Sequence, residues 1–267
     1  MNAVIEDIST IAMDECMTPS GVDCAAFELR QYTLHPGRRD TLIELFEREF
    51  VEPQEACGMR LFGQFRDLDD PDRFVWLRGF RDMRERAQAL AAFYGGPAWQ
   101  AHREAANATM VDSDNVLLLR PSRAGSGFAL AGTHRVATGS EPIPCGLVVA
   151  MIWQLPLRID AGLAALIEGR IAPLLLDAGA TLLASFVSEH AANTFPALPV
   201  REGENVLVLF ASFDDEAHWQ RSFGEQISPG ADPQVLRLAP SARSALRPAR
   251  GSVATIHHSQ GAPSCPR

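Results

Sequence analysis

The 267-residue chain contains no lysine. All 24 of its Lys and Arg residues are arginines. This absence excludes chemistry that needs a lysine amine, such as a Schiff base with a carbonyl substrate, a P-loop phosphate contact or a lysine general base. Basic residues are also outnumbered by 33 acidic residues, which leaves a net charge of −9. Since a nucleic-acid-binding domain carries a basic surface, we expect no nucleic-acid partner.

Cysteine is sparse and irregularly spaced. The five cysteines form no C-x-x-C pair, so we expect neither a disulfide framework nor a cysteine-ligated zinc ion. The sequence has no run of about 18 apolar residues, and its N-terminus carries acidic residues where a signal peptide carries basic ones. From these features we expect a cytoplasmic protein with reduced thiols and no membrane partner.

Patterns typical of metal and cofactor sites are missing as well. The seven histidines include no H-x-x-x-H or H-E-x-x-H pair. The acidic segment 66–73 lacks the glycine and the distal glutamate of an EF-hand loop, and the glycines at 125–127 lack the third glycine of a dinucleotide-binding loop. We therefore expect no metal ion and no cofactor.

Two segments, 27–123 and 147–243, follow the same order of predicted elements. Each begins with a strand-like apolar run and continues into a helix, in which Leu42, Phe46 and Phe50 of the first copy recur at every fourth position. Two strands, a second helix and a last strand follow in each copy. This order is β-α-β-β-α-β, the ferredoxin-like unit.

Composition predicts where the domains begin and end. We expect an N-terminal extension over 1–24, a first ferredoxin-like domain over 25–123 and a second, diverged one over 147–246. The segment 124–146 is rich in glycine, serine and proline and is predicted to be a linker. The final segment, 247–267, has no apolar periodicity and is predicted to be a disordered tail.

A single ferredoxin-like unit covers one face of its sheet with its own helices and leaves the other face bare. Two units whose sheets face each other cover both bare faces and form one barrel. The predicted fold class is therefore α+β, with two tandem β-α-β-β-α-β units that build an intramolecular dimeric α/β-barrel. Such a pseudo-dimer needs no second chain to cover its sheets, and further oligomerisation stays open.

Alternation along the strands predicts which side chains line the barrel. Phe27, Leu29, Val75 and Leu77 are predicted to face the helices. The alternate set is predicted to face the barrel interior and consists of Arg30, Tyr32, Phe62, Gln64, Trp76 and Arg78. Because a buried arginine needs a counter-charge, either Glu28 pairs with these arginines or a small organic anion binds between them and the aromatic rings.

The first copy resembles the NIPSNAP family. The resemblance rests on the E-L-R-x-Y-T-L strand at 28–34, the Pro36-Gly37 turn, the F-x-D helix start at 80–82 and the P-x-W motif at 97–99. It extends over about 27–121 and is weak over 147–243. NIPSNAP domains belong to the dimeric α/β-barrel superfamily, so the resemblance implies the same barrel, but it carries over no catalytic residues.

Two classes of function stay open. The first is a barrel protein that binds a small organic ligand, anionic or aromatic, or a protein partner. The second is an enzyme similar to the cofactor-independent monooxygenases of the same superfamily, or a haem-binding protein that uses His102 or His218 as its ligand. The sequence does not decide whether the chain is an enzyme. The candidate ligand-binding residues are Arg30, Tyr32, Gln64, Trp76, Arg78, Trp99 and His102.

Overall fold

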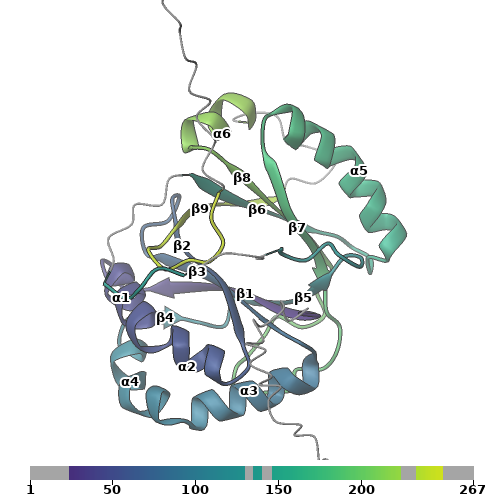
Figure 1. The fold of residues 1–267 in the computed structure, drawn as a ribbon. Helices are drawn as coiled ribbons and strands as arrows, with labels where there is room; N and C mark the ends of the chain where they lie inside the picture. The colour runs from purple at the N-terminus through teal and green to yellow at the C-terminus, as the bar shows by residue number, and fades with distance from the viewer. Residues whose placement is uncertain (1–23, 130–134, 140–145, 224–232, 249–267) are drawn as a thin grey trace, which may run out of the picture.

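The computed structural model describes residues 24–129, 135–139, 146–223 and 233–248 (Figure 1). The predicted extension and tail lie almost entirely outside these residues, and the boundaries predicted for the domains and the linker stay predictions. The elements of the first unit are β1 (Ala26–Leu34), α1 (Arg39–Glu49), α2 (Val51–Ala56), β2 (Arg60–Asp67), β3 (Arg73–Phe80), α3 (Met83–Gly95), α4 (Pro97–Asn107), β4 (Met110–Asp112) and β5 (Val116–Pro121). Those of the second unit are β6 (Leu147–Gln154), α5 (Ala161–Asp177), β7 (Thr181–Ser188), β8 (Val206–Phe213), α6 (Glu216–Phe223) and β9 (Gln234–Pro240).

Local signals in the sequence place the helix ends. The Asp82 side chain accepts a hydrogen bond of 2.7 Å from the backbone N–H of Glu85 and so caps α3. Gly58 and Gly179 follow α2 and α5 with φ values of +92° and +77°, a backbone region that glycine enters at little cost. Both glycines lie in the turns where the sequence predicts small residues after a helix.

Backbone hydrogen bonds close the strands into one antiparallel barrel, which confirms the predicted fold class. Eight of the nine described strands follow each other around it in the order β1-β3-β2-β9-β6-β8-β7-β5, and β5 pairs back with β1. The two units join where β2 pairs with β9, as in Phe65↔Pro240, and where β5 pairs with β7, as in Leu119↔Ser188. Short β4 extends the sheet beside the end of β1.

Helices cover the outside of the barrel on two sides. Figure 1 shows α1 to α4 beside the strands of the first unit and α5 and α6 beside those of the second. Each set forms its own apolar cluster with the outer sheet face that it covers. In the described part of the chain, no helix is long and apolar enough to cross a membrane.

The interior of the barrel is filled by apolar side chains of both units. The ring centroids of Phe27 and Phe186 are 4.7 Å apart, and Phe128 packs on Phe186 and Phe210 at 5.1 Å from each. Phe128 belongs to the segment after β5, so the connection between the units also contributes to this interior. These side chains therefore do not form a hollow barrel that could hold a substrate.

The predicted inward and outward faces of the first sheet are reversed. Phe27, Leu29, Val75 and Leu77 belong to the interior cluster, whereas Tyr32 and Trp76 pack against the helices with Arg30 and Arg78 beside them. The prediction was wrong because alternation separates two faces without saying which is inward. The interior is shared with apolar strands of the second unit, where a buried charge would find no partner.

A bulge explains why β2 follows neither the predicted assignment of its two faces nor the full reversal seen in β1 and β3. The register between β2 and β3 shifts between Leu61 and Gly63, which inserts one extra residue into the strand. Phe62 therefore lies in the barrel interior, as predicted. Gln64 pairs with Trp76 and so lies on the outer face, against the prediction.

Because one chain closes its barrel without a second copy, we expect a folded monomer in dilute solution. Light scattering and circular dichroism across a dilution series should give a molar mass near 29.1 kDa with unchanged secondary structure. Dissociation from a larger species that coincides with unfolding would contradict this expectation, because it would show that partner chains complete the fold.

Candidate functional site

A buried ion cluster centred on Glu28 lies on the outer face of the first sheet. Arg30 Nη1 donates to Glu28 Oε2 at 2.7 Å, and Arg78 Nε donates to the same oxygen at 2.8 Å. Arg86, which projects from α3, donates through Nε to Glu28 Oε1 at 2.7 Å. All four side chains have an exposed fraction of 0–1%. Strands and a helix far apart in the sequence therefore converge on one carboxylate.

The arginines decide the ionisation state of Glu28. Burial alone would raise the pKa of its carboxyl group, but attraction to Arg78, Arg30 and Arg86 outweighs burial and holds the pKa far below its usual range. Glu28 is therefore a carboxylate at neutral pH. The pairing predicted as one alternative from the sequence is observed, and it engages three arginines.

Neutral groups accept two further hydrogen bonds from the arginines of the cluster. Arg30 Nε donates to the Tyr32 hydroxyl at 2.9 Å, and Arg78 Nη1 donates to Gln54 Oε1 at 3.0 Å. These two acceptors come from β1 and α2, and both also line a cavity. The ion cluster is thus joined to the cavity by two direct hydrogen bonds.

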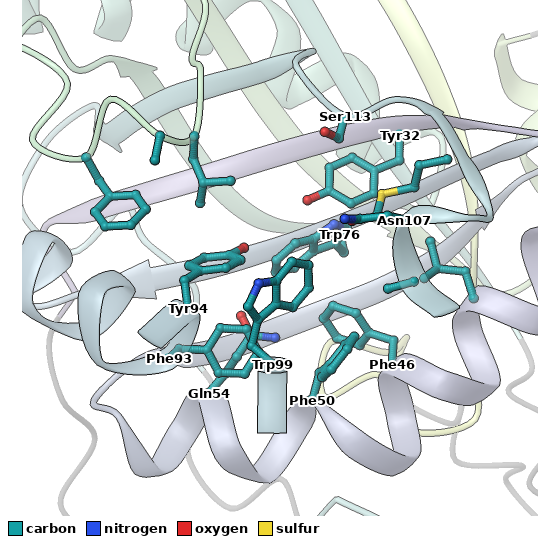
Figure 2. A pocket seen from close by; sticks show the side chains of 16 residues that line it. Tyr32, Phe46, Phe50, Gln54, Trp76, Phe93, Tyr94, Trp99, Asn107 and Ser113 are labelled. Carbon is teal, nitrogen blue, oxygen red and sulfur yellow. The ribbon is translucent and has the colours of Figure 1, made fainter. Parts of the chain in front are cut away.

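The cavity has a volume of about 280 Å³ and lies between the outer face of the first sheet and the helices that cover it. Figure 2 shows rings from several elements converging on it, among them Tyr32 of β1, Trp76 of β3, Phe50 between α1 and α2, and Trp99 of α4. The rings of Tyr32 and Trp76 meet edge to face at 5.8 Å. The lining is therefore mainly aromatic, with few polar atoms.

Two residues that line the cavity, Trp76 and Tyr32, keep a hydrogen-bond donor that the ion cluster does not use. Trp76 Nε1 is buried and has no hydrogen-bond partner among the described residues. The hydroxyl oxygen of Tyr32 accepts from Arg30, so its own hydrogen is free to be donated elsewhere. Figure 2 shows the Tyr32 and Tyr94 hydroxyls pointing toward one another across the cavity.

The loop between β7 and β8 brings part of the second unit to this cavity. The Phe195 ring stacks on Tyr94, with ring centroids 5.9 Å apart and planes inclined by 25°. Asn193 and Thr194 accept hydrogen bonds of 3.0 and 3.1 Å from Arg86 Nη1. Ala197, also on this loop, is exposed and lines the cavity. The cavity therefore belongs to both units.

Five of the seven sequence-derived candidates meet at this place. Tyr32, Trp76 and Trp99 line the cavity. Arg30 and Arg78 do not line it but lie directly behind its rings, with their Cζ atoms 5.5 and 5.0 Å from the centroid of the Trp76 ring. Neither arginine lines the cavity, so neither makes the direct contact with a bound anion that was one alternative from the sequence.

The other two candidates lie elsewhere. Gln64 receives a hydrogen bond of 3.4 Å from Arg135, a residue that also contacts Glu55 of α2. His102 Nε2 is 3.3 Å from a carboxylate oxygen of Glu49, and its side chain is one-third exposed. Neither residue lines the cavity.

The haem alternative has no support at this site. His218, the second histidine considered, packs on Phe213 in the other unit and does not line the cavity either. Within the described ranges, no three His, Cys, Asp or Glu side chains form a group that could hold a metal ion.

Sequence reasoning missed Gln54, Tyr94 and the loop residue Phe195. Gln54 is a polar residue on a short helix and is only 1% exposed, which no period in the sequence indicates. Tyr94 adjoins the P-x-W motif and could have been included with Trp99. Phe195 lies about a hundred residues from Tyr94 along the chain, so its contact depends on barrel closure.

The barrel and its helix-side cavity define the class of protein: a dimeric α/β-barrel that a single chain completes from two ferredoxin-like units. Residues 27–123, which make up most of its first unit, match the NIPSNAP family model. None of the curated proteins matches the sequence.

Several solved structures are similar to the chain. An uncharacterized NIPSNAP-like domain protein from Burkholderia xenovorans is 29% identical over 38% of this chain and 87% of its own, with a TM-score of 0.35. A monooxygenase candidate from Fusobacterium nucleatum is 8% identical over 81% of this chain and 92% of its own, with a TM-score of 0.47. Another monooxygenase candidate, from Lactobacillus acidophilus, is 12% identical over 82% of this chain and 94% of its own, with a TM-score of 0.44.

The Glu28 cluster should govern acid stability. The folded-state pKa of Glu28 lies below its unfolded value, so the stabilisation is fully present above about pH 4.5 and is lost as pH falls toward the folded pKa. Glu28→Gln should reduce the free energy of unfolding at neutral pH by about 3–5 kcal/mol, because it leaves buried arginines unpaired. The free energy of unfolding of the variant should also decrease less between neutral and acidic pH than that of the wild type.

Urea unfolding at pH 7 and at about pH 3.5 measures both effects. Glu49→Gln is the control, because Glu49 forms only partly exposed pairs, with Arg48 and with His102, each worth less than about 1 kcal/mol. A Glu28→Gln protein as stable as the wild type at pH 7 would show that the cluster does not stabilise the fold.

Proposed function

We propose that the protein binds a small organic molecule in the helix-side cavity of its NIPSNAP-like first unit. The observation that carries this proposal is the aromatic cavity, one of whose lining residues, Trp76, has a buried Nε1 without a partner among the described residues. A buried donor without a partner costs about 1–3 kcal/mol. A ligand that accepts a hydrogen bond there would remove this cost.

The dimensions of the cavity favour a small ligand. Its volume of about 280 Å³ lies just below the usual range for small-molecule sites, about 300–1,000 Å³. The floor is closed, with Tyr32 and Trp76 only 7% and 2% exposed. Asn107 and Ala197 at the rim are exposed. This arrangement supports a ligand of one or two fused rings that enters beside the β7–β8 loop.

The alternatives from the sequence are less well supported. A monooxygenase that holds its substrate inside the barrel requires a hollow interior, whereas Phe27, Phe128 and Phe186 pack together there. At this site, a protein partner would meet rings that line a concave cavity rather than an exposed apolar surface. The helix-side cavity therefore favours a small-molecule binder over either alternative.

Binding can be tested with small aromatic probes and a blocked cavity. We expect at least one of phenol, indole, 2-naphthamide and 2-naphthoate to bind with 1:1 stoichiometry in isothermal titration calorimetry. Ala197→Phe places a ring at the cavity rim and should weaken this binding by about tenfold or more, which corresponds to about 1.4 kcal/mol.

The matched control is Ala192→Phe, an equally large change at an exposed position of the same loop that does not line the cavity. The affinity of the Ala192→Phe protein for the same probe should stay within about twofold of that of the wild type, a difference of about 0.4 kcal/mol. The absence of binding by every probe, or an equal loss in both variants, would refute the proposed site.

A further inference from the structure

We propose that the cavity is selective for a small aromatic anion, with a carboxylate or phenolate as its charged group. This inference rests on the proposed function, because it specifies the class of ligand for the same cavity. It follows from an imbalance of buried charge, from the position of that charge and from the kind of polar atoms that the cavity presents.

The buried charges of the ion cluster do not balance. In the described part of the chain, every ion pair formed by Arg30, Arg78 and Arg86 is with Glu28. Arginine stays protonated in proteins, so three positive charges face one carboxylate. The nearest further acidic group is the Tyr32 phenol, and burial raises its pKa, so it is neutral at pH 7. Two positive charges therefore remain uncompensated by the residues that the structure describes.

The uncompensated charge lies directly behind the cavity wall. Arg30 Cζ is 5.4 Å from the ring centroid of Tyr32, and Arg78 Cζ is 5.9 Å from that of Tyr94. Both guanidinium groups also face the ring of Trp76. Each charge thus lies 5.0–5.9 Å from the centroids of rings whose residues line the cavity. Charges in such a buried site are weakly screened by salt and water, so the cavity has a positive potential.

The polar groups next to the cluster can donate hydrogen bonds to a ligand. The Tyr32 oxygen is occupied by Arg30 and Gln54 Oε1 by Arg78, which leaves the Tyr32 O–H and the Gln54 amide N–H groups to donate. Trp76 Nε1 can only donate. A carboxylate or phenolate oxygen accepts such bonds, and the arginine behind each partner polarises its O–H or N–H.

The remaining walls fit the apolar part of such a ligand. Phe50 packs on Phe93 and Trp99, with ring centroids 5.8 and 5.6 Å apart. Flat aromatic surfaces of this kind favour a planar ring over a flexible chain, since ring stacking adds to apolar burial. A ligand with a charged group near Tyr32 and a ring near Trp99 would use both regions.

The test compares two probes that differ in charge but hardly in shape, 2-naphthoate and its amide 2-naphthamide. At neutral pH we expect wild-type protein to bind the carboxylate about tenfold or more tightly than the amide, measured by isothermal titration calorimetry. Arg30→Gln removes one buried positive charge and should reduce this ratio to about threefold or less. Arg84→Gln, the control, removes an equal charge at a position on α3 that is 76% exposed and should leave the ratio unchanged.

The wild-type comparison remains decisive if Arg30→Gln fails to fold. Tyr32→Phe, which keeps every charge and removes one donor, should then lower the affinity for the carboxylate more than that for the amide. Equal binding of the two naphthyl probes, or tighter binding of the amide, would overturn the anion selectivity and leave the proposed site intact. A carboxylate preference that survives Ala197→Phe would place the anion outside the cavity and overturn the inference. If none of the four aromatic probes binds, both proposals fail.

Discussion

Each ferredoxin-like unit of this chain has an apolar sheet face that its own helices leave uncovered, and most other features follow from how that face is buried. The second unit covers it, so that the barrel interior is built from apolar residues of both units. A charged side chain in that interior would have no partner. The charged residues of β1 and β3 therefore lie on the outer face, where Glu28 joins Arg30 and Arg78.

The ion cluster and the cavity form one structural unit. Tyr32 and Gln54 each take a hydrogen bond from the cluster and each line the cavity. Arg86 links the same cluster to Asn193 and Thr194 of the second unit. The β7–β8 loop is thereby held against the cavity that it helps to line. The tandem arrangement thus provides part of the proposed binding site as well as a cover for the sheet.

Much of the fold could be predicted because it depends on local patterns. The cap at Asp82 and the turns at Gly58 and Gly179 are set by residues within a few positions. The site could be predicted only in part. Tyr32 and Trp76 were found because strand alternation places them on one face with Arg30 and Arg78, although that face was assigned to the barrel interior. Trp99 was found through the P-x-W motif of the family resemblance. Gln54 and Phe195 were missed because their contacts depend on elements far away in the sequence.

The sequence by itself determined the two β-α-β-β-α-β units and the separation of each strand into two faces, because periodicity and short-range signals encode these properties. The repeat of the unit then indicated one barrel, because each of two such sheets leaves a bare face that the other can cover. The tertiary structure decided which face points inward. It also decided that Glu28 would bind three arginines and that a loop of the second unit would reach Tyr94. These outcomes depend on which surfaces can be buried together and on where a buried charge finds its partner, and neither is a property of any local stretch of the chain.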